Sequence, residues 1–189
     1  MPTRVLLDAN VLMSRTLRDA IFLIQIESPG MFATCWTEDI LAETLYHLRR
    51  RNPRLDGRVV AAVRDKVSQV MSERIEGYPI LEMPGLADRD DRHVHSAAVA
   101  GQVGILVTDD RGFLDLDPAS MGALSYDIVS ADGFLVLADD SGPDAVRRMV
   151  RRQWEYWRGR DPASDLPARF VAAGCPAFAE RVAGHIREL

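Results

Sequence analysis

The sequence predicts an α/β protein with three layers (α/β/α), in which a central, mainly parallel β-sheet lies between helices, and a helical C-terminal extension follows. Short apolar runs, each too short for a helix, alternate with longer segments whose apolar residues recur at helical spacing. Such alternation is typical of parallel sheets, in which helices connect successive strands. An arginine- and tryptophan-rich stretch near the C-terminus marks where the alternation ends.

Five segments are predicted to be extended. The first is a buried strand at the start of the chain, and the carboxylate Asp8 follows it directly. The third fits either a short strand or an extended connection, whereas the others are predicted strands. In chain order, the segments are Arg4–Leu7, Met31–Trp36, Tyr78–Met83, Ile105–Val107 and Tyr126–Val129.

Between these segments, apolar residues recur at helical spacing. Thr37 is a good N-cap, and the acidic residues that follow it suit the first turn of a helix. Ser130 or Asp132 is expected to cap a later helix. The predicted helices lie around Leu17–Ile24, from Thr37 to about Arg49, at Gly57–Glu73, at Arg92–Gly101 and at Ser130–Leu137.

Length and composition fit one compact domain with an appended element. The chain has 189 residues, of which 47% are hydrophobic. The clearest linker is Asp139–Pro143, so we predict a domain at residues 1–140 and a helical extension at residues 141–189. A net charge of −5 argues weakly against a general nucleic-acid binder, although the arginines are clustered.

Membrane insertion and export are not expected. No apolar run is long enough to span a bilayer, and the N-terminus lacks the pattern of a signal peptide. We therefore expect a cytoplasmic protein. Cys35 and Cys175 lie far apart in apolar surroundings, which predicts reduced, buried thiols.

Four acidic sites recur in similar local positions. Asp8 follows the first strand, Glu43 lies in an early helix, and pairs of aspartates precede the helix at Arg92 and follow the strand at Ile105. Carboxylates crowded at one edge of a parallel sheet repel one another and persist only with protons or cations between them. Oxygen ligands without Cys or His at ligand spacing indicate Mg²⁺ or Mn²⁺, and such a site supports phosphodiester hydrolysis.

Each acid taken singly also has an ordinary structural explanation. Asp91 or Asp110 alone is more simply a helix cap or a turn former. Glu43 alone is more simply a solvated residue of a helix. Asp8 is more suggestive, because it follows a buried strand and no obvious capping pattern requires it. Taken together, the four sites outweigh these explanations.

Four short motifs, in their order and spacing, resemble the PIN-domain ribonuclease family and most closely its bacterial branch of VapC-like toxins. The motifs are Val5–Leu12, Thr37–Glu43, Asp88–Val94 and Leu106–Asp110. The resemblance extends from Arg4 to about Leu137. It implies a PIN-like fold, bound Mg²⁺ or Mn²⁺ and cleavage of RNA. It further implies the toxin of a type II toxin–antitoxin pair, an antitoxin partner and a homodimer.

The resemblance assigns four catalytic and metal-binding acids, which are Asp8, Glu43, Asp91 and Asp110. Two of them have acidic neighbours as alternatives. Asp91 is preferred to Asp90 because the family places its acid three residues before an apolar helix position. Asp110 is preferred to Asp109 because the family has Thr, one variable residue, then Asp or Asn. Asn10 and Thr108 either orient a carboxylate or water or bond to the backbone.

Arginines near these acids are candidate RNA contacts. Arg92 and Arg111 adjoin site acids, whereas Arg49, Arg50 and Arg51 follow the helix that carries Glu43. The last three also suit the C-terminal end of a helix, where cations are favoured. His93 and His95 cannot face the same side of a helix, and a solvated or packing role is expected for each.

Two functional classes remain open. The first is a metal-dependent endoribonuclease acting on single-stranded or structured RNA. The second is a non-catalytic PIN-like module that binds RNA or serves as a scaffold. The arginine-rich tail with Trp154, Tyr156 and Trp157 lies outside the resemblance. It is expected to pack on the domain or on a second protomer, with RNA contact as the second choice.

Overall fold

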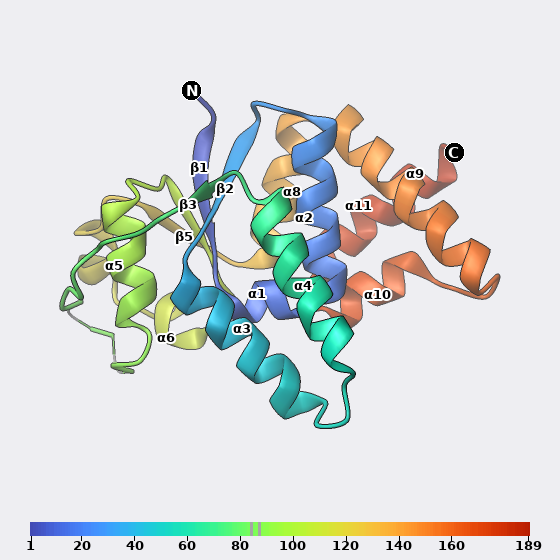
Figure 1. Cartoon of the computed structure of the whole chain (residues 1–189). Helices are drawn as coiled ribbons and strands as arrows, with labels where there is room; N and C mark the ends of the chain where they lie inside the picture. The colour runs from blue at the N-terminus through green and yellow to red at the C-terminus, as the bar shows by residue number, and fades with distance from the viewer. Residues whose placement is uncertain (84, 87) are drawn as a thin grey trace. The chain divides into compact units, whose positions relative to one another are not determined.

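The computed structural model describes residues 1–83, 85–86 and 88–189 (Figure 1). These residues form two compact units, each discontinuous in sequence. The sheet unit contains residues 1–13 and 32–129, and the helical unit contains residues 14–31 and 130–189. The sequence predicts a boundary at residue 140 between two continuous segments. These discontinuous units do not test that boundary, which stays a prediction.

The sheet unit is built on five parallel strands, which confirms the predicted α/β class. Their order across the sheet is β3-β2-β1-β4-β5. The central strand β1 pairs with β2 and β4, so that Leu6 lies beside Cys35 on one side and Leu106 on the other. All three side chains are fully buried. The strands are β1 (Thr3–Leu7), β2 (Phe32–Trp36), β3 (Glu73–Arg74), β4 (Ile105–Val107) and β5 (Asp127–Val129).

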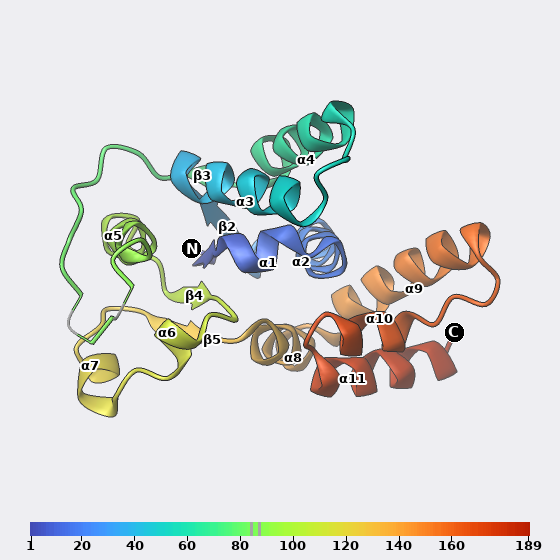
Figure 2. The same cartoon turned by 90° about the horizontal axis from the view of Figure 1, so that it is seen from below.

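The strand order places a topological switch point between β1 and β4. From β1 the chain moves outward to β3, and it then returns to the other side of β1. Right-handed crossovers therefore put those helices of the sheet unit that precede β3 on one face of the sheet and those that follow it on the other. Figure 2 shows α5 and α7 on one side of the strands and α1 and α4 on the other. Ligands of open α/β sheets bind beside such a switch point, at the carboxyl ends of the strands.

Six helices belong to the sheet unit among its described residues. Thr37 caps α3 by accepting a hydrogen bond of 3.0 Å from the backbone N–H of Ile40, as its position in the sequence predicts. The helices are α1 (Ala9–Met13), α3 (Glu38–Arg51), α4 (Gly57–Val70), α5 (Arg92–Ala100), α6 (Arg111–Leu114) and α7 (Pro118–Gly122).

The segment between α4 and α5 differs from the sequence prediction. The helix predicted to reach Glu73 ends at Val70, and the following residues form the edge strand β3. Here Ser72 and Ile75 donate backbone hydrogen bonds of 3.0 and 2.9 Å to carbonyls of β2, which replace the bonds that a longer helix would make. The segment Tyr78–Met83 contains no strand and is an extended connection.

The helical unit consists of five helices among the described residues. The sequence prediction of a linker at Asp139–Pro143 is wrong, because α8 continues to Ser141 and only Gly142 separates it from α9. Asp139 is 4% exposed and holds α8 to α11, which explains why this polar stretch is helical. The helices are α2 (Arg15–Glu27), α8 (Ala131–Ser141), α9 (Pro143–Arg160), α10 (Leu166–Ala172) and α11 (Pro176–Arg187).

Ser130 and Asp132 cap two different helices. Ser130 accepts from the N–H of Gly133 and caps α8, its own helix. The carboxylate of Asp132 instead accepts from the N–H groups of Ala177 and Phe178, at 3.1 and 2.8 Å, in the first turn of α11. Asp132 thereby satisfies backbone donors of a helix whose own N-cap side chain makes no such bond.

The cysteines behave as predicted, since both are free and buried. None of the described helices is long and apolar enough to cross a membrane.

Candidate active site

The centre of the candidate site is Asp8, which follows β1 beside the switch point. Its backbone N–H donates to the carbonyl of Val107 at 3.1 Å, so its position continues the pairing of β1 with β4. The residue is only 6% exposed. Oδ1 accepts a hydrogen bond of 2.6 Å from the N–H of Ala9. The fold therefore holds a carboxylate in a fixed orientation at the carboxyl edge of its central strand.

Asn10 and Thr108 fix the second oxygen of Asp8. The Asn10 amide and the Thr108 hydroxyl donate to Asp8 Oδ2 at 2.7 and 2.6 Å. The Thr108 hydroxyl also accepts from the N–H of Asp110 at 3.0 Å, and Asn10 Oδ1 accepts from the N–H of Asp109 at 3.1 Å. Both predicted supporting residues thus bond to the backbone and to a carboxylate. Together they join the loop after β1 to the loop after β4.

Asp110 and Asp91 both have a carboxylate oxygen near Gly112. Asp110 Oδ1 accepts from the Gly112 N–H at 2.6 Å and caps α6. A methyl group added to Gly112 would lie 2.8 Å from this oxygen and 3.8 Å from Asp91 Oδ2. Asp91 occupies the N-cap position of α5, but its side chain makes no capping bond. The absence of a side chain at Gly112 therefore lets the Asp110 carboxylate approach its backbone closely.

Burial and mutual repulsion disfavour ionisation of two of these acids. Burial raises the pKa of Asp8 to about 6, and the charges of Glu43 and Asp110 add to the increase. Burial likewise raises the pKa of Asp91 to about 6, with further contributions from Asp110, Asp88, Asp8 and Glu43. Glu43 and Asp110 are therefore close enough to Asp8 and Asp91 to raise the pKa of both. Their excess negative charge favours a cation.

Glu43 differs from the other three acids because two histidines flank it. His93 Nε2 lies 3.4 Å from Oε2, and His47 Nε2 lies 3.4 Å from Oε1. The contact with His93 lowers the pKa of Glu43 despite partial burial. Glu43 is therefore held as a carboxylate.

The surroundings of His93 favour its charged form. Its Nδ1 lies 2.6 Å from the carbonyl oxygen of Asp90, which can only accept a hydrogen bond, so Nδ1 carries a proton. Burial lowers the pKa of His93, but Glu43 and this carbonyl outweigh burial and the net pKa is raised. A proton on Nε2, the atom that faces Glu43, is thus favoured.

The expectation of a merely solvated or packing role does not describe His93, whereas it does describe His95. His95 is buried and bonds to the hydroxyl of Tyr126 at 2.8 Å. His93 and His95 therefore face different surroundings, as helical spacing requires. The useful signals in the sequence were the spacing of His47 four residues after Glu43 and of His93 two residues after Asp91.

The alternative acids Asp90 and Asp109 are both exposed. The N–H of Asp90 donates to Asp88 Oδ1 at 2.9 Å, in a turn before α5, and its carbonyl accepts from His93. Asp109 is tied to Asn10 through its N–H. The choice between each pair of neighbours stays a prediction.

The five arginines predicted to contact RNA have different surroundings. Arg92 pairs with Glu82 at 2.6 Å, and Arg111 pairs with Asp115 at 3.3 Å. Arg49, Arg50 and Arg51 form the last turn of α3, where they suit the helix dipole. That turn lies roughly 9–12 Å along the helix axis from Glu43. RNA contact by these residues stays a prediction.

The donor chemistry of the site fits a hard divalent cation. Among the described residues, no group of three or more His, Cys, Asp or Glu side chains is arranged to hold a metal ion. Mg²⁺ is nevertheless commonly held by one or two carboxylates and several waters, and does not need a cage of protein ligands. The raised pKa values of Asp8 and Asp91 indicate negative charge that such an ion would neutralise. The residues therefore fit Mg²⁺ or Mn²⁺ bound partly through water.

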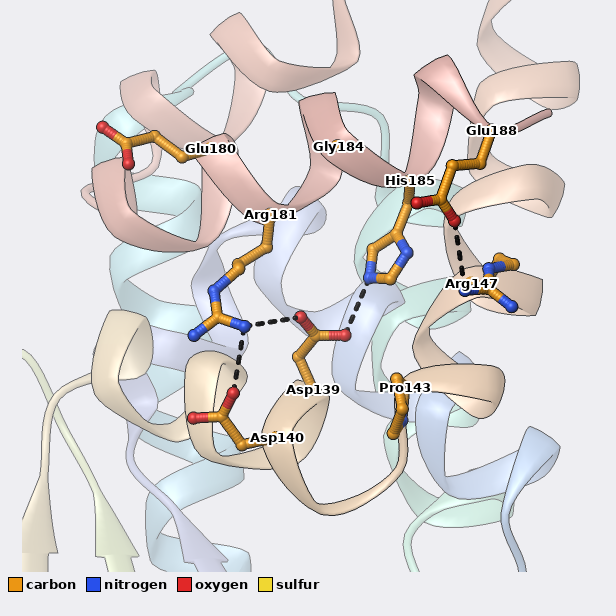
Figure 3. Close-up of a pocket in the computed structure, with 9 residues that line it drawn as sticks. All are labelled: Asp139, Asp140, Pro143, Arg147, Glu180, Arg181, Gly184, His185 and Glu188. Carbon is orange, nitrogen blue, oxygen red and sulfur yellow. Dashed lines mark hydrogen bonds and ion pairs between the residues drawn. The ribbon is translucent and has the colours of Figure 1, made fainter.

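A second cluster of charged side chains lies in the helical unit and has a different character. Figure 3 shows Asp139 between His185 and Arg181, at 2.7 and 3.5 Å. The adjoining pocket has a volume of about 400 Å³. Acids of α8 here pair with cations of α11, and Arg147 of α9 pairs with Glu188 at 3.1 Å. These pairs join helices to one another and leave no cluster of repelling carboxylates like that around Asp8.

Comparison with known families gives one finding. The family model described as PIN domain matches residues 4–112, which is more than half of the chain and includes all four predicted site acids. No curated protein and no solved structure matches the chain significantly.

Proposed function

Because the chain belongs to the PIN-domain family, whose members are generally nucleases, we propose that it is a metal-dependent endoribonuclease. It hydrolyses phosphodiester bonds of single-stranded or structured RNA. The observation that carries the proposal is the electrostatic coupling of Asp8, Glu43, Asp91 and Asp110 beside the switch point of the sheet. The coupled acids come from four separate parts of the sequence, and α/β sheets bind their ligands beside such a switch point.

Asp8, Asp91, Asp110 and Glu43 are the residues that would hold Mg²⁺ or Mn²⁺. When bound, such an ion neutralises charge on a phosphate and makes water a better nucleophile at neutral pH. Thr108 and Asn10 keep the Asp8 carboxylate oriented. The absence of a side chain at Gly112 leaves room for the Asp110 carboxylate. The contact with His93 lowers the pKa of Glu43 and so favours its ionised form.

The test compares RNA cleavage by the wild type and Asp8→Asn in buffers containing Mg²⁺, Mn²⁺ or EDTA. We expect cleavage by the wild type with either metal, and none with EDTA or with Asp8→Asn. Asp127→Asn is a matched control, because this exposed aspartate begins β5 at the opposite edge of the sheet. Cleavage by Asp8→Asn at the wild-type rate would refute the proposal.

One observation favours the non-catalytic alternative, a PIN-like RNA-binding or scaffold module. No ready-made group of metal ligands is present among the described residues. On this alternative, neither Mg²⁺ nor Mn²⁺ would change stability or promote cleavage. RNA binding would then be the same in EDTA and in Mn²⁺, whereas the nuclease proposal requires a metal-dependent product.

We also propose that the chain is the toxin of a type II toxin–antitoxin pair and is held inactive by an antitoxin protein. The motifs that resemble VapC-like toxins support this role. Induced expression of the wild type should arrest growth, and Asp8→Asn should not. Co-expression with the product of a small neighbouring gene should restore growth. Arrest by Asp8→Asn as strong as by the wild type would contradict the role. The predicted homodimer can be tested by light scattering.

A further inference from the structure

The last two turns of α9 carry a surface that the carboxylate site does not explain. This α9 surface comprises Trp154, Tyr156, Trp157, Arg158 and Arg160. It lies outside the matched residues 4–112. Helix α9 has six arginines and only two acidic residues, although the whole chain has a net charge of −5. This helix is thus locally basic, and two of its arginines, Arg158 and Arg160, lie next to aromatic rings.

Neighbouring helices hold the α9 surface in place. The guanidinium of Arg169, from α10, lies 3.6 Å from the ring centroid of Trp157, and that of Arg15, from α2, lies 4.9 Å from it. Arg15 also donates to the hydroxyl of Tyr156 at 2.7 Å. Trp157 therefore packs between cations of two other helices. Because these contacts already order the rings, binding of a ligand would cost little additional conformational entropy.

The outer groups of the α9 surface remain available. Tyr156 is 42% exposed, and the guanidinium groups of Arg160 and Arg15 lie 4.6 and 5.8 Å from its ring centroid. Arg158 lies 4.8 Å from the Trp154 ring centroid. Arg158 and Arg160 are exposed and form no ion pair with any described residue. By contrast, Arg148 and Arg152, earlier in α9, both pair with the carboxylate of Glu27.

This combination distinguishes a nucleic-acid surface from an ordinary helix end. The helix dipole accounts for cations in the last turn, but not for an exposed tyrosine beneath one of them. Single-stranded nucleic acid offers phosphates to cations and base faces to aromatic rings and guanidinium planes. An acidic protein segment would use the cations alone. The side chains therefore match a single strand better than they match an acidic partner.

We propose that the α9 surface binds single-stranded RNA. Arg158 and Arg160 contact phosphates, and a base stacks against Tyr156 and the guanidinium that covers it. The choice of RNA rests on the proposed function, but binding itself requires neither metal nor cleavage. The helical unit thus contributes a substrate-binding surface of its own.

The test measures RNA affinity in EDTA, so that the RNA stays intact. A labelled 12-nucleotide RNA of mixed sequence is titrated with the full chain, as a single strand and as a duplex, at several salt concentrations. Arg158→Gln/Arg160→Gln should weaken binding of the single strand and reduce the slope of log Kd against log salt by about 1.4, since each phosphate contact on a single strand contributes about 0.7. The matched control Arg64→Gln/Arg187→Gln removes the same charge from exposed positions outside the surface and should keep the wild-type slope.

A second variant tests stacking separately from charge. Tyr156→Leu should weaken single-strand binding about five- to 100-fold with an unchanged salt slope. Tyr156→Phe keeps the ring and should bind like the wild type. The duplex should bind more weakly than the single strand, because its bases are not available for stacking. RNA carrying 4-thiouridine should crosslink to the peptide that contains Tyr156.

The outcomes separate this inference from the nuclease proposal. Wild-type affinity and slope in both the arginine and the Leu variants would refute the inference even if Mn²⁺-dependent cleavage is normal. Loss of affinity in these variants without any cleavage by the wild type would refute only the nuclease. If Tyr156→Leu changes the oligomeric state while RNA affinity stays the same, the surface is a protein contact and the inference is wrong.

Discussion

A buried, hydrogen-bonded carboxylate at position 8 is costly for the free protein. Asp8 accepts three hydrogen bonds that favour its charged form, yet burial and neighbouring acids still raise its pKa to about 6. Keeping a negative charge on Asp8, at the end of β1, therefore lowers the free energy of unfolding. Such destabilising charges are common at functional sites, and the binding of a ligand of opposite charge offsets their cost.

The pH dependence of stability should reveal this cost. Between the ordinary Asp pKa of about 3.9 and the raised value, folded Asp8 binds more protons than unfolded Asp8. Its contribution to the free energy of unfolding therefore falls as the pH rises towards 6 and stays low above it. Lowering the pH from 7 to 5 in EDTA should stabilise the wild type relative to Asp8→Asn by roughly 1 kcal/mol. Urea unfolding at both pH values measures the difference, and parallel pH profiles would contradict the assignment.

Thr108 provides a second test at the scale of one side chain. Thr108→Val keeps the shape but removes the donor to Asp8 and the acceptor for the Asp110 N–H, and both groups are poorly exposed. We expect a loss of about 1–3 kcal/mol in the free energy of unfolding. Thr108→Ser restores the hydroxyl and should recover most of it. A Val variant as stable as the wild type would show that water replaces the hydroxyl.

At the scale of elements, the sequence is informative where a local signal and the tertiary structure agree. Apolar runs identify β1, β2 and β4. Thr37 caps α3, which follows β2, and Ser130 caps α8, which follows β5. The two errors have a tertiary cause. β3 forms because an edge of β2 accepts it, and α8 continues because Asp139 pairs with residues of α11. Neither partner is adjacent in sequence, so periodicity alone could not indicate them.

The cap of α11 by Asp132 is a tertiary contact of the same kind. Asp132→Ala leaves two N–H groups at the start of α11 without their acceptor. The expected loss is about 1–2 kcal/mol in the free energy of unfolding. Asp132→Asn retains an acceptor and should lose less. Thermal unfolding should show that Asp132→Asn is more stable than Asp132→Ala. Equal destabilisation by the two substitutions would contradict this role of Asp132.

At the scale of the molecule, the sequence indicates the acids of the candidate site but not the residues that surround them. Motif order selects Asp8, Glu43, Asp91 and Asp110, and strand order explains how acids so far apart in sequence come to interact. The raised pKa of His93 depends on a carbonyl and on a carboxylate from another helix, which the sequence does not indicate. The ordering of Trp157 likewise depends on Arg15 and Arg169, from two other helices.

Metal binding should therefore be visible in the unfolding of the whole chain. All four acids lie in the sheet unit, and a ligand that binds only the folded state raises its stability by mass action. At a free Mn²⁺ concentration of 100 times Kd, the expected gain is about 2.7 kcal/mol. Calorimetry should show this gain in the wild type and in Asp127→Asn. Asp8→Asn and Asp91→Asn should show a smaller gain, and EDTA should reverse it in every case. If the chain unfolds in two steps, Mn²⁺ should shift only the step of the sheet unit. An unchanged thermogram at millimolar Mn²⁺ would favour the non-catalytic module, because the carboxylates would then repel one another with no ion to relieve them.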